Sequence, residues 1–232
     1  MFGGFGELVA AFAIFLCLHS IPPMRPVKQR LISLLGKRGY YLGYSLLSLL
    51  VIAWLLQAVW HAPYIELWSY EYWAARGTAY IMLPASVLFL SGFLRPNPLS
   101  IGPAAGYRAD QAGFVGVVRH PALWGFALWS GAHLLVNGDL AAVIFFGGLL
   151  LLSLGGMFIV DRRRRKILGD DTWQILAENT SNFPFLALLR GGNCRPVRAD
   201  IWAVVAGGLS YLLLIWLHPF VIGVSPLSGF FE

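Results

Sequence analysis

The sequence predicts an all-α, polytopic integral membrane protein with about six transmembrane helices and both termini on the outer side of the membrane. The 232 residues are 58% hydrophobic and only 12% charged, a balance typical of membrane proteins rather than soluble domains. The charged residues are clustered, which leaves six uncharged stretches of at least 17 residues, and each can cross a bilayer. The basic residues fall in alternate connections, as the positive-inside rule requires.

The six stretches define the expected helices in order. The spans are expected near residues 6–23, 40–61, 77–94, 120–137, 140–160 and 201–220. The connections after the first, third and fifth spans hold 16 of the 17 lysines and arginines, which places these connections in the cytoplasm and both termini outside. The chain is therefore expected to form a single transmembrane domain over residues 1–232.

The connections carry signals of their own. Asn137-Gly138-Asp139 predicts a tight turn, so the fourth and fifth spans should form an antiparallel hairpin. The segment 179–189 is apolar but too short to cross, and we expect it to lie in the membrane interface. The basic block Arg162–Lys166 is interpreted as a topology signal that contacts anionic lipid headgroups. This interpretation accounts for much of the net charge of +6 without a nucleic-acid partner. The oligomeric state is left open.

Histidines inside the spans are the first candidates for a functional site, because ionisable groups at membrane depth are expensive. His19 is the twelfth residue of its uncharged stretch, and His133 lies six residues before Asp139. At 1.5 Å per residue these positions lie roughly 17 Å and 9 Å below the outer surface. Two imidazoles and a flat cofactor could bridge this difference in depth, although hydrogen bonding to a neighbouring helix is the alternative role of each histidine.

His120 gives a second possible pairing. It lies thirteen residues before His133, which means roughly 20 Å of rise and nearly opposite helix faces. These two histidines cannot ligate the same iron. If two axial histidines hold a haem, the leading pair is His19 with His133, and the reserve pair is His19 with His120.

Arg119-His120-Pro121 forms a local motif at the inner end of the fourth span. The proline fits the first turn of a helix and presents Arg119 and His120 beside its positive end. An arginine there suits a phosphate, a carboxylate or a haem propionate. The alternative is that these residues only anchor and cap the helix.

Several motifs, in order along nearly the whole chain, resemble the NnrU family of bacterial membrane proteins. They are His19-Ser20, Arg119–Gly125, Ala132–Leu135, Asp161–Arg164, Thr180–Phe185 and His218-Pro219. The resemblance implies a multi-pass protein of the bacterial inner membrane that is associated with nitrite and nitric oxide metabolism in denitrifiers. The family is related to plant zeta-carotene isomerase, which implies haem b held at His19 and His133. It also implies isomerase-like or redox chemistry on a lipophilic small molecule such as a polyene.

A second resemblance points to another chemistry. Arg119–Gly125 and the helical hairpin that follows it are similar to membrane methyltransferases that bind S-adenosylmethionine. Asp161-Arg162 stands where those enzymes have two glutamates, and the arginine should disfavour a cationic sulfonium. Three functions are therefore considered: a haem-dependent isomerase, a non-enzymatic accessory protein of nitrite or nitric oxide reduction, and an S-adenosylmethionine-dependent methyltransferase.

Overall fold

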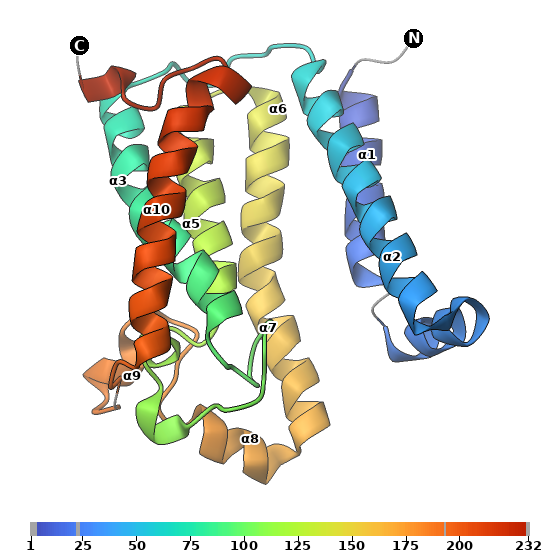
Figure 1. Ribbon diagram of the computed structural model, residues 1–232. Coiled ribbons are helices and arrows are strands. Elements are labelled where there is room, and N and C mark those ends of the chain that lie inside the picture. The colour runs from blue at the N-terminus through green and yellow to red at the C-terminus, as the bar shows by residue number, and fades with distance from the viewer. Residues whose placement is uncertain (1–3, 22–23, 193, 231–232) are drawn as a thin grey trace. The chain divides into compact units, whose positions relative to one another are not determined.

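The protein is all-helical. A computed structural model describes residues 4–21, 24–192 and 194–230, and within these ranges it contains no strand beyond an isolated antiparallel bridge between Glu66 and Asp139. The chain divides into two compact units (Figure 1). The first comprises residues 1–68 and 138–145, and the second comprises residues 69–137 and 146–232.

Helices overlap each of the ranges expected to be spans. The longer ones are α1 (Phe5–Ser20), α2 (Arg25–Trp60), α3 (Tyr72–Leu94), α5 (Pro121–Val136), α7 (Gly148–Leu168), α8 (Asp170–Ala177) and α10 (Arg198–Val221). The short ones are η1 (Ala109–Gln111), α4 (Phe114–Val117), α6 (Leu140–Ala142), the π-helical turn η2 (Val143–Gly147), α9 (Leu186–Leu189) and η3 (Ser228–Phe230). Residues 22 and 23, at the end of the first expected span, lie outside the described residues.

Four helical stretches are long and apolar enough to cross a membrane. They are Pro26–Trp60, Tyr72–Leu94, Leu140–Leu168 and Arg198–Val221. α1 and α5 are apolar but have 16 residues each, which gives about 24 Å of length. Large apolar side chains lie exposed along the long helices, such as Leu42 at 72% and Trp216 at 63%. Such surfaces are stable in lipid and costly in water.

The first unit is built on α1 packed against α2 (Figure 1). Leu8 is fully buried in this unit, and Trp54 Nε1 donates a hydrogen bond to Glu7 Oε1 at 3.0 Å. α2 bends at Gly36, whose φ of 71° is readily adopted only by glycine. Lys28 Nζ donates to the Tyr41 hydroxyl at 3.1 Å, which ties together the two sides of this bend.

The turn expected at Asn137–Asp139 is present between α5 and α6. The side chain of Asp139 caps α6 by accepting from the backbone N–H of Ala142 at 3.0 Å. Leu67 N–H donates to the carbonyl of Gly138, where an added Cβ would collide with Trp68. In the second unit α5 packs against α7, as the hairpin prediction requires.

Small residues allow the helices of the second unit to approach closely. α3 packs against both α5 and α10, and its buried surface includes Ala75 and Ala79. A Cβ at Gly125 would lie 2.7 Å from the carbonyl oxygen of Ala85, and one at Gly207 would lie 2.6 Å from Val87 Cα. Small residues at such contacts are typical of membrane helix packing, because association there depends on close van der Waals contact.

The segments that connect these helices form a polar layer at one end of the second unit. Figure 1 places α8, α9 and the loop after α3 at the end opposite η3. The segment expected in the interface, 179–189, lies in this layer and includes α9. Its Phe183, Phe185 and Leu189 are exposed. The buried polar residues of the layer include Asn97, Ser100, His120 and Thr180, and these residues build the candidate site.

Candidate functional site

His120 is the centre of a buried polar cluster in the second unit. It precedes Pro121, the first residue of α5, and its side chain is 0% exposed. Its Nε2 lies 3.1 Å from Asp161 Oδ1, and its Nδ1 lies 2.8 Å from the Ser100 hydroxyl. An ionised carboxylate only accepts hydrogen bonds, so Nε2 carries a proton, and in the neutral ring Nδ1 accepts the hydroxyl proton of Ser100.

Arg119 approaches the same carboxylate from the preceding position. Its Nη1 donates to Asp161 Oδ2 at 2.7 Å, and its Nε donates to the Thr180 hydroxyl at 2.9 Å. Its guanidinium carbon lies 4.9 Å from the ring centroid of Trp173 on α8. Asp161, on α7, thus supplies one anionic partner of Arg119 within the chain.

Asp161 is the residue that joins the cluster. It accepts from Arg119, from His120 and from Asn182 Nδ2, which lies 2.8 Å from its Oδ2. The side chains of Asp161 and Arg119 are 15% and 11% exposed. A partly buried pair of this kind is stable when further hydrogen bonds satisfy both ions, and removing one partner leaves the other uncompensated.

Backbone contacts hold the cluster in place. Asn97 Nδ2 donates to the carbonyl of Arg119 at 2.8 Å, and Arg119 N–H donates to the carbonyl of Ser181 at 2.7 Å. Trp124 Nε1 donates to the carbonyl of Asn182 at 2.8 Å, and Arg164 Nη2 to that of Ser100 at 2.6 Å. The cluster therefore fastens the start of α5 to the end of α7, the loop after α3 and the segment after α8.

A pocket of about 330 Å³ opens beside Arg119. Its lining includes Glu178, Thr180, Ser181 and Arg190, and it offers a polar ligand a route to Arg119. Ser100 and His120, in contrast, are almost completely buried, so the Ser100–His120–Asp161 chain of hydrogen bonds faces the protein interior. In this arrangement its role is to orient α5.

His133 lies near the opposite end of α5 in an aromatic setting. Its ring centroid is 5.2 Å from that of Phe146 and 5.4 Å from that of Trp129. Its Nδ1 lies 2.9 Å from the carbonyl oxygen of Trp129, one helical turn earlier. Ser130, close by on the same helix, is buried and donates its hydroxyl to the carbonyl of Phe126 at 2.7 Å.

His19 lies near the end of α1 in the first unit. Its ring centroid lies 4.2 Å from that of Phe15, with the two planes tilted by 37°, and 6.5 Å, edge-on, from that of Tyr44 of α2. Its Nδ1 lies 2.9 Å from the carbonyl oxygen of Phe15. His19 thus repeats the local geometry of His133, with an aromatic residue four positions earlier.

This geometry sets the tautomer of both rings. A carbonyl oxygen can only accept, so Nδ1 carries the proton in His19 and His133, and Nε2 keeps its lone pair. Histidines that ligate a metal commonly donate their other N–H to a carbonyl in this way, so both residues fit the donor chemistry of a haem ligand. His61 makes the same contact with the carbonyl of Gln57, so the geometry alone does not single out a ligand pair.

The predicted site residues are therefore distributed over the two units. Arg119 and His120 meet at Asp161, His133 lies at the far end of the same helix, and His19 belongs to the first unit. Within the described residues, no group of three or more His, Cys, Asp or Glu side chains is arranged to hold a metal ion. A haem with two axial ligands does not require such a group.

Sequence reasoning did not identify Ser100, Asn182 and Thr180 as members of the cluster. Asn182 and Thr180 belong to a motif that was recognised, but their contacts depend on residues 21 to 61 positions away. The sequence pattern does not pair Asp161 with Arg119, whereas the structure does. The available signal was a lone acidic residue at the end of a span, directly before five basic residues.

The chain is similar to one described family and to two curated proteins. The family model described as NnrU protein matches residues 7–226. The chloroplastic 15-cis-zeta-carotene isomerase of Arabidopsis thaliana is 25% identical over 195 residues, which cover 79% of this chain and 50% of that protein. That of Zea mays is 33% identical over 81 residues, which cover 35% of this chain and 22% of that protein. The chain thus spans about half the length of the Arabidopsis protein, and its match to the maize protein covers less than a quarter of that protein. No solved structure matches the chain.

Proposed function

This chain belongs to the NnrU family, and on that premise we propose that it is a haem b membrane protein that isomerises a cis double bond in a lipophilic polyene such as zeta-carotene. The observation that carries the proposal is the similarity to 15-cis-zeta-carotene isomerase over 79% of the chain. The tautomers of His19 and His133 support it, because each ring keeps Nε2 available for a metal.

The proposal includes the topology. Six helices cross the bacterial inner membrane, with both termini in the periplasm and the basic connections in the cytoplasm, where Arg162–Lys166 contact anionic headgroups. The charge distribution supports this orientation, since 16 of 17 basic residues lie in alternate connections. α1 and α5 are about 6 Å shorter than a hydrocarbon core of roughly 30 Å, so flanking residues or local thinning of the bilayer must complete these two spans.

The ligand pair we propose is His19 with His133. The reserve ligand, His120, has both ring nitrogens engaged, by Ser100 and by Asp161, and is fully buried. Haem b, when bound, supplies an iron that can exchange an axial ligand and engage a double bond. The chain's own residues supply the imidazole nitrogens, and the rings of Phe15, Trp129 and Phe146 pack beside the two imidazoles.

The test is an absorption spectrum of the detergent-purified protein, oxidised and dithionite-reduced, with pyridine haemochrome analysis. We expect a b-type spectrum in the wild type and in His120→Ala, and its loss in His19→Ala and His133→Ala. His61→Ala is the matched control, because His61 makes the same Nδ1 contact with a carbonyl. Isomerase activity is then assayed on 15-cis-zeta-carotene by chromatographic separation of the isomers.

Each result distinguishes between the proposed functions. Haem held by His19 and His133 with turnover of the polyene supports the isomerase. The same haem without turnover favours the alternative, an accessory protein of nitrite or nitric oxide reduction. Absence of a Soret band after haem reconstitution overturns the proposal, and tight S-adenosylmethionine binding that depends on Arg119 and His120 would then favour a methyltransferase.

A further inference from the structure

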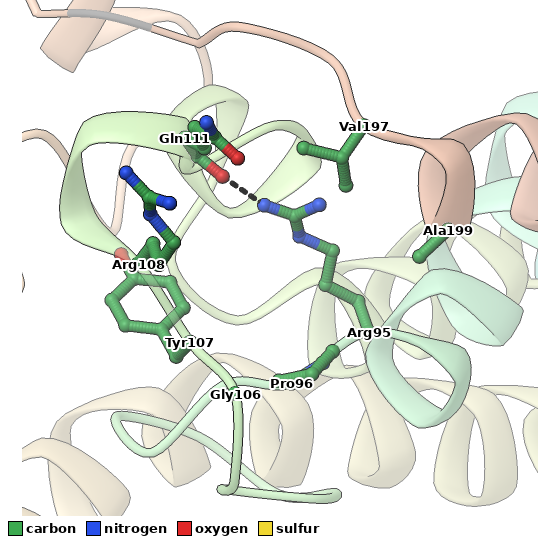
Figure 2. A pocket seen from close by; sticks show the side chains of 8 residues that line it. All are labelled: Arg95, Pro96, Gly106, Tyr107, Arg108, Gln111, Val197 and Ala199. Carbon is green, nitrogen blue, oxygen red and sulfur yellow. Dashed lines mark hydrogen bonds between the residues drawn. The ribbon is translucent and has the colours of Figure 1, made fainter.

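A second pocket lies in the polar layer of the second unit, away from the His120 cluster. Figure 2 shows it where the end of α3 meets the start of α10. Its volume is about 290 Å³, and its lining includes Arg95, Tyr107, Arg108, Gln111, Val197 and Ala199. The space suits a compact polar group, and the residues around it indicate which charge that group carries.

Arg95 is the buried charge of this pocket, at 4% exposure. Its Nη1 lies 3.3 Å from Asp200 Oδ2, and its Nη2 donates to the carbonyl of Gln111, the contact dashed in Figure 2. Its Nε has no acceptor among the described residues. An unpaired donor on a buried guanidinium is costly, and an anionic oxygen is the acceptor that best relieves this cost.

Asp200 only partly compensates the charge of Arg95, because its carboxylate also accepts hydrogen bonds from two backbone N–H groups. It accepts from Val197 N–H at 2.8 Å and from Phe114 N–H at 3.3 Å. The first of these bonds caps α10, a helix of 24 residues. Val197 and Ala199 line the pocket, so the positive end of the α10 dipole lies beside it.

Further arginines lie on the segments that line the pocket. Arg108 forms an ion pair with the exposed Asp110. The hydrogen bond from Arg108 lowers the pKa of the Asp110 carboxyl below its usual value, and the charge of Arg195 lowers it further. Arg198 begins α10. Arg95 and Arg108 line the pocket, and Arg195 and Arg198 flank its Val197 in the sequence. These arginines outnumber the aspartates of the same segments, Asp110 and Asp200, which favours an anion.

We infer that this pocket binds a phosphate group, carried either by the headgroup of an anionic phospholipid or by a free phosphate in solution. The buried Arg95 and the start of α10 provide the phosphate contacts, Arg108 provides charge at the opening, and the ring of Tyr107 forms a wall. The inference is independent of the haem proposal, because it uses neither His19 nor His133.

Binding is measured by isothermal titration of the detergent-purified full chain with three probes. These are dihexanoyl phosphatidylglycerol, dihexanoyl phosphatidylcholine and inorganic phosphate. Arg95→Gln would leave Asp200 buried without its partner, so the test uses Arg108→Gln and Ala199→Leu, which fills the pocket without changing charge. Arg76→Gln removes an exposed arginine of α3 outside the pocket and is the matched control.

We expect Arg108→Gln and Ala199→Leu each to weaken anion binding by about tenfold, with Arg76→Gln unchanged. If the variants show these effects with phosphatidylglycerol, and inorganic phosphate binds more weakly, the bound phosphate group belongs to a lipid headgroup. If the variants show these effects with inorganic phosphate, and it binds as tightly as phosphatidylglycerol or more tightly, the bound group is a free phosphate. Equal weakening in Arg76→Gln would overturn the inference, and so would undiminished binding in Ala199→Leu. Equal binding of phosphatidylcholine, or no binding of either anion to the wild type, would also overturn it.

Discussion

Replacing Asp161 by alanine removes a carboxylate that contacts Arg119, His120 and Asn182 at once. The arginine is 11% exposed and the histidine is 0% exposed, so water cannot fully replace the lost acceptor. Breaking a buried pair from one side costs about 3–5 kcal/mol. Because Asp161 itself is 15% exposed, we expect the lower part of this range, about 3 kcal/mol of unfolding free energy.

The size of the effect is checked against two other variants. Asp161→Asn keeps the volume and one acceptor oxygen but loses the charge, and should cost about 1.5–2 kcal/mol. Asp170→Ala removes the partner of Arg165 in a pair whose side chains are 67% and 48% exposed, and should cost under about 1 kcal/mol. The free energies are measured by unfolding the protein in mixed micelles of mild detergent and dodecyl sulfate.

One result would refute this reasoning: an Asp161→Ala cost no larger than that of Asp170→Ala. The pair itself is tested by a double-mutant cycle of Arg119→Gln with Asp161→Asn. Residues in direct contact within one network couple by about 0.5–3 kcal/mol, and the 2.7 Å contact between Arg119 and Asp161 requires a coupling in that range. Additive costs would mean that the two side chains are stabilised by separate partners.

Two further predictions concern packing and ionisation. Gly207→Val should destabilise the second unit by about 1–3 kcal/mol, because its Cβ would lie 2.6 Å from Val87 Cα, whereas Gly208→Val, with nothing within 4 Å, should cost less in the same assay. Burial raises the pKa of Tyr107 to about 12 from 10.0. As the pH rises, the unfolded chain therefore loses the phenol proton before the folded chain does. The unfolding free energy should fall by about 2 kcal/mol between about pH 10 and pH 12. Tyr107→Phe should remove this fall in unfolding free energy at alkaline pH, and it also removes the hydrogen bond to the Leu176 carbonyl. If the dependence of unfolding free energy on pH is unchanged in this variant, Tyr107 is not the titrating group.

The helices were largely predictable because uncharged runs and turn residues are local signals. The predicted and observed helices differ where the prediction ended a span at a charged residue. α2 begins at Arg25 rather than near residue 40, since lysine and arginine are good helix formers in water. Gly36 then supplies the bend that the charge pattern could not reveal. α3 begins at Tyr72, five residues before its predicted span, and includes Arg76 for the same reason.

The candidate site was predictable only in part. Arg119-His120-Pro121 is a contiguous motif, so its position at the start of α5 could be read from the sequence. Its partners lie 20 residues before it, at Ser100, and 41 and 61 residues after it, at Asp161 and Thr180. No local periodicity connects positions so far apart, because their contact is created by the packing of α3, α5 and α7.

The Arg-His-Pro segment has a structural role in the buried polar cluster. In a site for a sulfonium cation the surroundings must be net acidic or aromatic, whereas Asp161 is already compensated by Arg119 and followed by Arg162. Instead, the cluster fixes the first residues of α5 against α7, and α5 carries His133 near its other end. A helix held at one end by three directional contacts cannot rotate freely about its axis. His133 lies about 20 Å along the helix axis from His120, so α5 carries both the buried polar cluster and the histidine proposed as a ligand.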